Sequence, residues 1–212
     1  MIPAFEVYLF DVDGTLVDSA QDIVGAIQGV LASTPRADVP FDFIKRYIGR
    51  HLVDLFQDLF PDYTPAQIDA LVVEYRRLYP LRNHASTTAY PGVAEALAAL
   101  SGRKSTATTK GTPTTRIVLE RFGLLPYFDH VQGTDGFPAK PHPAVIFKAL
   151  EGLGSSPAVC LFVGDSPADI EAAHRAGVKS CAVTYGYGQR EELAFWKPTY
   201  WANHLSDLLL HS

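Results

Sequence analysis

The stretch Glu6–Thr15, EVYLFDVDGT, decides the fold of this chain. Its first half is a short apolar run that contains β-branched and aromatic residues, which predicts a buried strand. Asp11 and Asp13 follow two residues apart, so both would face the same side of a continuing strand, and Gly14 then allows an abrupt turn. Because ligands bind beyond the carboxyl ends of parallel strands, the stretch predicts a strand that delivers two carboxylates to a site.

Further strands and helices alternate through the second half of the chain. Ala158–Val163 (AVCLFV) and Ser180–Thr184 (SCAVT) are apolar runs typical of strands that are covered on both faces. Helical spacing of apolar residues lies around them, in residues 93–100, 117–122, 145–153 and 168–176. Arg103–Lys110 (RKSTATTK) lies where another strand is needed, although it is polar. The alternation predicts a doubly wound α/β fold with a mostly parallel, Rossmann-like sheet.

The segment between the first strand and this alternation has a different pattern. Apolar residues recur at helical spacing in 23–31 and again in 68–78, and 41–60 is also typical of helix. No strand is predicted in this segment. We therefore expect residues 17–85 to form an all-helical cap domain, inserted after the first strand into an α/β core domain formed by residues 1–16 and 86–212.

Composition limits the class of protein. Hydrophobic residues make up 47% of the 212 residues and charged residues 19%, which excludes a disordered chain. The net charge is −5 with no basic stripe, so a nucleic-acid partner is not expected. No apolar run approaches the roughly 18 residues that a membrane span requires, and the first residues lack a signal-peptide pattern. We expect a soluble, cytoplasmic protein in which Cys160 and Cys181 are buried and reduced.

A second acidic group follows a later strand. The sequence GDSPAD places Asp165 at the tip of the strand that ends near Gly164, and Asp169 in the first turn of the next helix. Asp169 alone is explained by helix capping, but a carboxylate at a strand tip is placed for ligand contact. Several converging carboxylates would bind a hard divalent cation, and Mg²⁺ is the expected one. The seven histidines are scattered and form no zinc motif.

These motifs together resemble those of the haloacid dehalogenase superfamily of phosphohydrolases. DVDGT follows the first strand and GDSPAD a later one, Ala107–Lys110 (ATTK) stands at the second motif of the family, and Lys140–Pro143 (KPHP) resembles the third. The order and spacing cover the whole chain. The longer stretch DVDGTLVDS, followed by a helical block, looks like the phosphoglycolate phosphatase branch, whose cap is inserted after the first motif.

The resemblance implies a role for each matching residue. Asp11 would be the nucleophile and would form an aspartyl-phosphate, while Asp13 would protonate the leaving alcohol and later activate water. The resemblance further implies that Mg²⁺ is held by Asp11, by the backbone carbonyl of Asp13 and by Asp165. Phosphoryl oxygens would be bound by Lys140, the Thr108 hydroxyl and backbone N–H groups near Gly14 and Thr109, with Thr109 an alternative contact to Thr108. Asp169 would orient Lys140 or a water of the metal ion.

Several alternatives remain open within the family. An acidic residue at position 13 favours phosphate chemistry over dehalogenation. A β-phosphoglucomutase-like sugar phosphomutase and a non-catalytic phospho-ligand-binding protein are the other functions considered, and a Schiff base on Lys45 is less favoured. Arg46 or Arg50 of the helical block could bind a substrate carboxylate, although solvated arginines are more common. The expected partner is a small phosphorylated metabolite, with 2-phosphoglycolate first, and the protein is expected to be a monomer or a homodimer.

Overall fold

A parallel sheet forms the centre of the protein. The structure is a computed structural model, and it describes residues 1–209. Within these residues the main sheet has five strands in the order β4-β1-β5-β6-β7, and each neighbouring pair is parallel. The strands are β1 (Val7–Phe10), β4 (Arg103–Thr106), β5 (Cys160–Gly164), β6 (Lys179–Val183) and β7 (Tyr200–Ala202). The expected doubly wound α/β class is confirmed.

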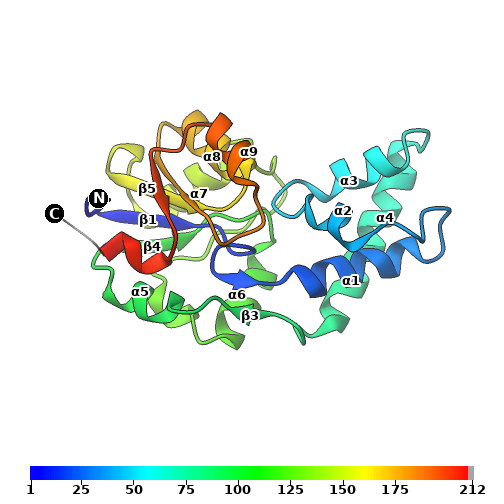
Figure 1. Cartoon of the computed structure of the whole chain (residues 1–212), viewed down its shortest axis with the longest axis horizontal. Coiled ribbons are helices and arrows are strands. Elements are labelled where there is room, and N and C mark those ends of the chain that lie inside the picture. The colour runs from blue at the N-terminus through cyan, green and yellow to red at the C-terminus, as the bar shows by residue number, and fades with distance from the viewer. Residues whose placement is uncertain (210–212) are drawn as a thin grey trace.

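Helices cover both faces of this sheet, as Figure 1 shows. In β1, Tyr8 and Phe10 pack into one core, whereas Val7 and Leu9 pack into the other. The first core includes apolar residues of α5, α6 and η4, and the second those of α7 and α8. The helices are α5 (Val93–Ala99), α6 (Thr112–Arg121), α7 (Ala144–Leu153), α8 (Pro167–Ala176) and α9 (Arg190–Phe195), with 3₁₀ turns η2 (Leu125–Tyr127), η3 (Pro157–Val159) and η4 (Leu205–Leu209).

A helical block follows β1 and has a hydrophobic core of its own. It contains α1 (Ala20–Leu31), α2 (Phe41–Lys45), α3 (Leu52–Leu59), α4 (Pro65–Leu78) and η1 (Tyr79–Arg82). The buried core residues of the block all lie between Ile23 and Tyr79. In Figure 1 the block lies at the right, beyond the end toward which β1 points. The exact domain boundaries at residues 16 and 85 stay a prediction.

The structure differs from the sequence-based expectation at the borders of this block. Residues 17–85 were expected to contain no strand, but β2 (Val17–Asp18) pairs antiparallel with β3 (Thr88–Ala89). This ribbon joins the entrance of the block to its exit, and two residues are too few to produce a strand pattern. The helix-like region 41–60 is divided into α2 and α3 by a loop in which Gly49 has a φ of 92°. Glycine adopts such a φ without strain, so Gly49 allows the chain to turn between the two helices.

No helix among residues 1–209 is long and apolar enough to cross a membrane. Cys160 and Cys181 are both buried and both free, as expected.

Candidate active site

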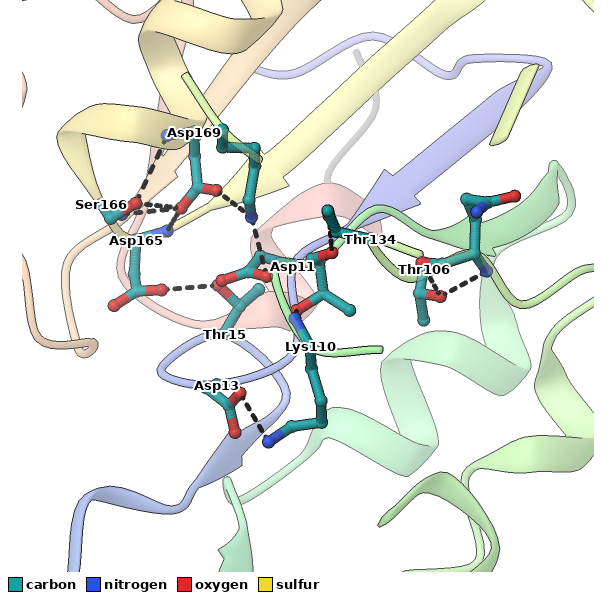
Figure 2. A network of polar contacts seen from close by, with 12 residues as sticks. Asp11, Asp13, Thr15, Thr106, Lys110, Thr134, Asp165, Ser166 and Asp169 are labelled. Carbon is teal, nitrogen blue, oxygen red and sulfur yellow. Dashed lines mark hydrogen bonds and ion pairs between the residues drawn. The ribbon is translucent and has the colours of Figure 1, made fainter. Parts of the chain in front are cut away.

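The acidic residues of the two motifs meet where β1 and β5 end. Asp11 follows β1 directly and Asp165 follows β5, and these strands are paired in register through Phe10 and Val163. Asp169 lies in the first turn of α8. One carboxylate oxygen from each of these three aspartates lies within 4.8 Å of the others, and all three residues are buried. Figure 2 shows this cluster.

A buried lysine lies inside the cluster. The Nζ atom of Lys140 is 2.8 Å from Oδ1 of Asp11 and 2.5 Å from Oδ1 of Asp169. The Lys140 side chain is fully buried, and its ammonium lies 5.4 Å from the ring centre of Phe162. The expected proximity of Lys140, Asp11 and Asp169 is therefore present in the structure.

Asp169 both caps its helix and supports the cluster. Its Oδ2 accepts hydrogen bonds from the backbone N–H of Asp165 (3.1 Å) and from the N–H and hydroxyl of Ser166 (2.9 and 2.7 Å). Ser166 in turn completes a capping box at the start of α8. Because Oδ2 is occupied in this way, Oδ1 is left to face Lys140. The capping interpretation and the site interpretation of Asp169 are thus compatible.

Burial controls the electrostatics of these groups. Burial raises the pKa of Asp11 to about 6, and the charge of Lys140 offsets part of this effect while Asp169 adds to it. Burial and the charges of Asp169 and Asp11 raise the pKa of Asp165 well above its usual range. For Lys140 burial acts to lower the pKa, but Asp11 and Asp169 outweigh it and the pKa is raised. One buried ammonium therefore does not balance the carboxylates around it.

The residues fit a hard divalent cation. Oδ1 of Asp11 is buried. It forms an ion pair with Nζ of Lys140 at 2.8 Å, but this contact lacks hydrogen-bond geometry. Asp165 is held in place by Thr15, whose Oγ1 donates to Oδ1 at 3.0 Å, and by the N–H of Tyr187, which donates to Oδ2 at 2.7 Å. Oriented carboxylate oxygens are the ligands that Mg²⁺ prefers. Asp11 and Asp165 are the side chains that would hold it.

The carboxylate of Asp13 is directed to different partners. Its Oδ1 accepts a hydrogen bond of 2.5 Å from the hydroxyl of Ser19, and its Oδ2 lies 3.1 Å from Nζ of Lys110. Figure 2 shows Asp13 and Lys110 side by side, apart from the three clustered aspartates. The Asp13 side chain is therefore not a member of the acidic cluster, and the contact of its backbone carbonyl with a metal ion stays a prediction.

Gly14 allows the turn after β1 to pass close to Asp165. Its φ is 90°, and an added Cβ would collide with the Asp165 carboxylate. The N–H of Gly14 donates to the carbonyl of Val17 at 2.8 Å, and the contact of Gly14 with a phosphoryl oxygen that the resemblance implies stays a prediction. The absence of a side chain at Gly14 thus lets the backbone approach the Asp165 carboxylate closely.

The expected phosphate-binding threonines follow β4. Thr108 is fully buried, its carbonyl accepts a hydrogen bond from Thr134 (2.9 Å), and its Oγ1 lies 3.4 Å from the N–H of Lys110. Thr109 is partly exposed. The structure places both residues after the strand that neighbours β1, and their contact with phosphate stays a prediction.

Arg46 and Arg50 line a cavity of about 290 Å³ between the helical block and the core. Ser166, which follows Asp165, and Tyr187, whose N–H donates to Asp165, line its other side, so the cavity adjoins the surroundings of Asp165. Arg50 lies over the ring of Tyr47 at 5.4 Å. The expected contact of Arg50 with substrate therefore stays a prediction, because this cavity is not lined by Asp11 or Asp13.

Four residues of the site were not predicted from the sequence: Thr15, Ser19, Lys110 and Tyr187. The first three lie in stretches that were singled out, DVDGTLVDS and ATTK, but no role was assigned to them from the sequence. Tyr187 reaches Asp165 through its backbone, which no sequence pattern reports.

The fold and site define a class: a doubly wound α/β protein with a carboxylate cluster and a buried lysine at the carboxyl ends of its strands. The family model described as haloacid dehalogenase-like hydrolase matches residues 8–183. The chain belongs to this family.

Individual relatives agree with the assignment. The chain is 32% identical over 211 residues to phosphoglycolate phosphatase 1 of Pseudomonas aeruginosa, which covers 95% of this chain and 77% of that protein. It is 31% identical to pyrophosphatase PpaX of Bacillus pumilus, over 95% and 93% of the two chains. A haloacid dehalogenase-like hydrolase of Streptococcus pneumoniae superposes with a TM-score of 0.87 at 25% identity, covering 97% of each chain. The expected class, a phosphatase in the phosphoglycolate phosphatase-like branch, is confirmed by these similarities.

Proposed function

We propose that this protein is a Mg²⁺-dependent phosphomonoester hydrolase that works through an aspartyl-phosphate on Asp11. The observation that carries the proposal is the contact of Lys140 with Asp11 and Asp169 within a buried carboxylate cluster. A nucleophilic carboxylate needs nearby positive charge to receive a phosphate, since both are anions. Lys140 supplies part of that charge.

The first step is attack of a carboxylate oxygen of Asp11 on phosphorus. The P–O bond to the alcohol breaks, and the alcohol oxygen takes a proton from Asp13. In the second step Asp13 removes a proton from water, which attacks the phosphorus of the aspartyl-phosphate and releases inorganic phosphate with Asp11 restored. Lys140 neutralises charge that develops on the phosphoryl oxygens, and the buried Thr108 hydroxyl is placed to donate to one of them.

A divalent cation at Asp11 and Asp165 would supply further charge neutralisation for the phosphoryl group. Mg²⁺ suits the site because its donors are carboxylates and the described residues bring no histidine or cysteine into the cluster. Asp169 would hold Lys140 in place, which its hydrogen bonds to Ser166 make possible.

The proposed substrate is a small phosphomonoester, with 2-phosphoglycolate as the first candidate because the branch contains phosphoglycolate phosphatases. Inorganic pyrophosphate, an anhydride rather than an ester, is the second candidate, since another relative of similar identity is named a pyrophosphatase. Both substrates carry a second anionic group beside the reacting phosphate. Arg46 and Arg50 are the cationic side chains of the helical block that line the cavity against the core.

The test is release of inorganic phosphate from a substrate panel with Mg²⁺ and with EDTA. The panel contains p-nitrophenyl phosphate, 2-phosphoglycolate, pyrophosphate and a hexose 1-phosphate. We expect Mg²⁺-dependent release, and we expect Asp11→Asn to lower turnover by on the order of 10⁴-fold or more while the thermal melt is preserved. Conversion of the hexose 1-phosphate to its 6-phosphate without phosphate release would instead identify a phosphomutase. Undiminished hydrolysis by Asp11→Asn would exclude Asp11 as the nucleophile.

A further inference from the structure

Both oxygens of the Asp13 carboxylate contact side chains that have no role in the two proposed reaction steps. Ser19 contacts Oδ1 at 2.5 Å and Lys110 contacts Oδ2 at 3.1 Å, and Asp13 is only 7% exposed. The terminal torsion of an aspartate is otherwise broad, so a carboxylate that is held at one oxygen can still turn. A carboxylate that is held at both oxygens keeps one orientation.

The Ser19 hydroxyl is not used for its usual purpose. Ser19 is the N-cap of α1, where a serine oxygen ordinarily accepts a hydrogen bond from the N–H of the second or third helical residue. No such bond is present, and Ser19 donates to Asp13 instead. The local structure of α1 therefore does not explain the direction of this side chain.

Burial of the Lys110 ammonium costs free energy. Its side chain is 7% exposed, and a buried ammonium must be paired to offset its lost hydration. Its partners are Asp13, the Tyr79 hydroxyl at 3.0 Å and the face of the Tyr79 ring, whose centre is 4.5 Å away. Replacing such a buried pair by apolar residues is often neutral or stabilising, so stability does not account for Lys110.

Both contacts of Asp13 depend on residues at the ends of the helical block. Ser19 lies immediately before α1, and Tyr79, which holds Lys110 from the other side, begins η1 directly after α4. Lys110 itself lies in the core, in the loop after β4. A shift of the block relative to the core would therefore disturb both oxygens of Asp13.

We propose that Ser19 and Lys110 are positioning residues for Asp13, which fix the orientation of its carboxylate and tie that orientation to the seating of the helical block. This inference rests on the proposed function, because it takes Asp13 as the acid and base. It differs from a role in binding substrate charge, in which Lys110 would contact an anionic group of the alcohol.

The experiment compares kcat/KM for two esters without a second charge, p-nitrophenyl phosphate and ethyl phosphate, and includes 2-phosphoglycolate, which carries one. Nitrophenolate leaves without a proton, whereas ethanol needs one, so only the second ester depends on a well-placed Asp13. For Lys110→Met and Ser19→Ala we expect kcat/KM for ethyl phosphate to fall by about 10- to 100-fold and that for p-nitrophenyl phosphate by less than about 3-fold. Lys110→Arg should restore part of the loss. Lys148→Met, which removes an exposed lysine of α7, is the matched control and should change neither value.

Several results would overturn the proposal. Equal losses for the two esters would indicate a structural role, and an unchanged value for ethyl phosphate with a loss confined to 2-phosphoglycolate would assign Lys110 to substrate binding. Should Lys110→Met fail to fold, Ser19→Ala, which leaves the ion pair in place, carries the same comparison. Failure of the wild-type protein to release phosphate from either ester or from 2-phosphoglycolate with Mg²⁺ would overturn the proposed function instead, and the two failures are therefore distinguishable.

Discussion

Lys140 places its ammonium 2.8 Å from Oδ1 of Asp11, inside a site where both side chains are almost completely buried. The proposed nucleophile thus has a fixed positive neighbour before any metal ion or substrate arrives. Because Asp165 and Asp169 lie in the same cluster, this single ammonium is also what limits the repulsion among three carboxylates.

Removing Lys140 should destabilise the protein as well as inactivate it. In Lys140→Met the carboxylates of Asp11 and Asp169 lose their shared partner while remaining buried. We expect the free energy of unfolding to fall by about 3–5 kcal/mol, measured by urea denaturation without divalent ions. Lys148→Met removes a lysine whose side chain is 54% exposed and should change it by less than about 0.5 kcal/mol. Similar small effects in both variants would contradict the view that the charge of Lys140 offsets that of the cluster.

Adding Mg²⁺ should stabilise the folded protein, because a divalent cation between Asp11 and Asp165 relieves their repulsion. At a concentration about 100 times the dissociation constant, the gain is about 2.7 kcal/mol. The thermal melt in Mg²⁺ and in EDTA measures this gain without any substrate. The gain should be lost in Asp165→Asn and kept in Asp42→Asn, which alters an exposed aspartate of α2. A melting shift of the same size in both variants would place the ion elsewhere.

The strands of the main sheet show what a sequence pattern can and cannot predict. β1, β5 and β6 are apolar because both of their faces are covered, and they were found from that property. β4 is polar, yet it is a strand, because its side chains meet specific partners: Ser105 lies 3.0 Å from Nδ1 of His130, and Thr106 exchanges hydrogen bonds with Gln132. These partners are brought together only by tertiary contacts, so intrinsic strand propensity does not predict β4.

The candidate site divides in the same way. Asp11, Asp165 and Lys140 could be predicted because strand ends and motif spacing determine their positions. Lys110 and Ser19 could not, because their contacts with Asp13 depend on how the loop after β4 and the start of α1 meet across the molecule. The missing information is the packing of the helical block against the core, which periodicity within each segment does not contain.

We expect Asp22 to hold α1 against the chain segment that leaves the helical block. It is fully buried, and its Oδ2 accepts hydrogen bonds from the N–H of Ser86 (2.9 Å) and the hydroxyl of Thr87 (2.7 Å). Asp22→Ala would leave the hydroxyl of the buried Thr87 without this acceptor, which costs about 1–3 kcal/mol, and would free the N–H of the exposed Ser86. Urea denaturation measures the loss, and hydrogen exchange at the Ser86 amide should accelerate. An unchanged exchange rate at Ser86 would show that the segment is held by other contacts.

Stability should decrease in mildly acid solution because of His84. This residue is 6% exposed, it packs edge to face on Tyr79 at 5.4 Å, and its Nδ1 lies 3.5 Å from the Tyr79 hydroxyl. Burial, followed by the charge of Lys110, lowers the pKa of His84 below its usual value. The folded protein therefore favours the neutral imidazole, while the unfolded chain takes up a proton near pH 6.5, at about the ordinary histidine pKa.

The sign of the effect follows from this difference. The stability that His84 contributes is fully present above about pH 6.5 and is lost as the pH falls from there toward the lowered pKa of the folded state. Urea midpoints between about pH 7.5 and pH 5.5 should therefore fall more steeply in the wild type than in His84→Asn. Asparagine suits this position because His84 has a φ of 49°, which asparagine tolerates. Contributions from His130, whose pKa burial also lowers, and from the carboxylates are common to both proteins and cancel in the comparison. Parallel pH profiles for the two proteins would mean that His84 accepts its proton equally well in the folded and unfolded states.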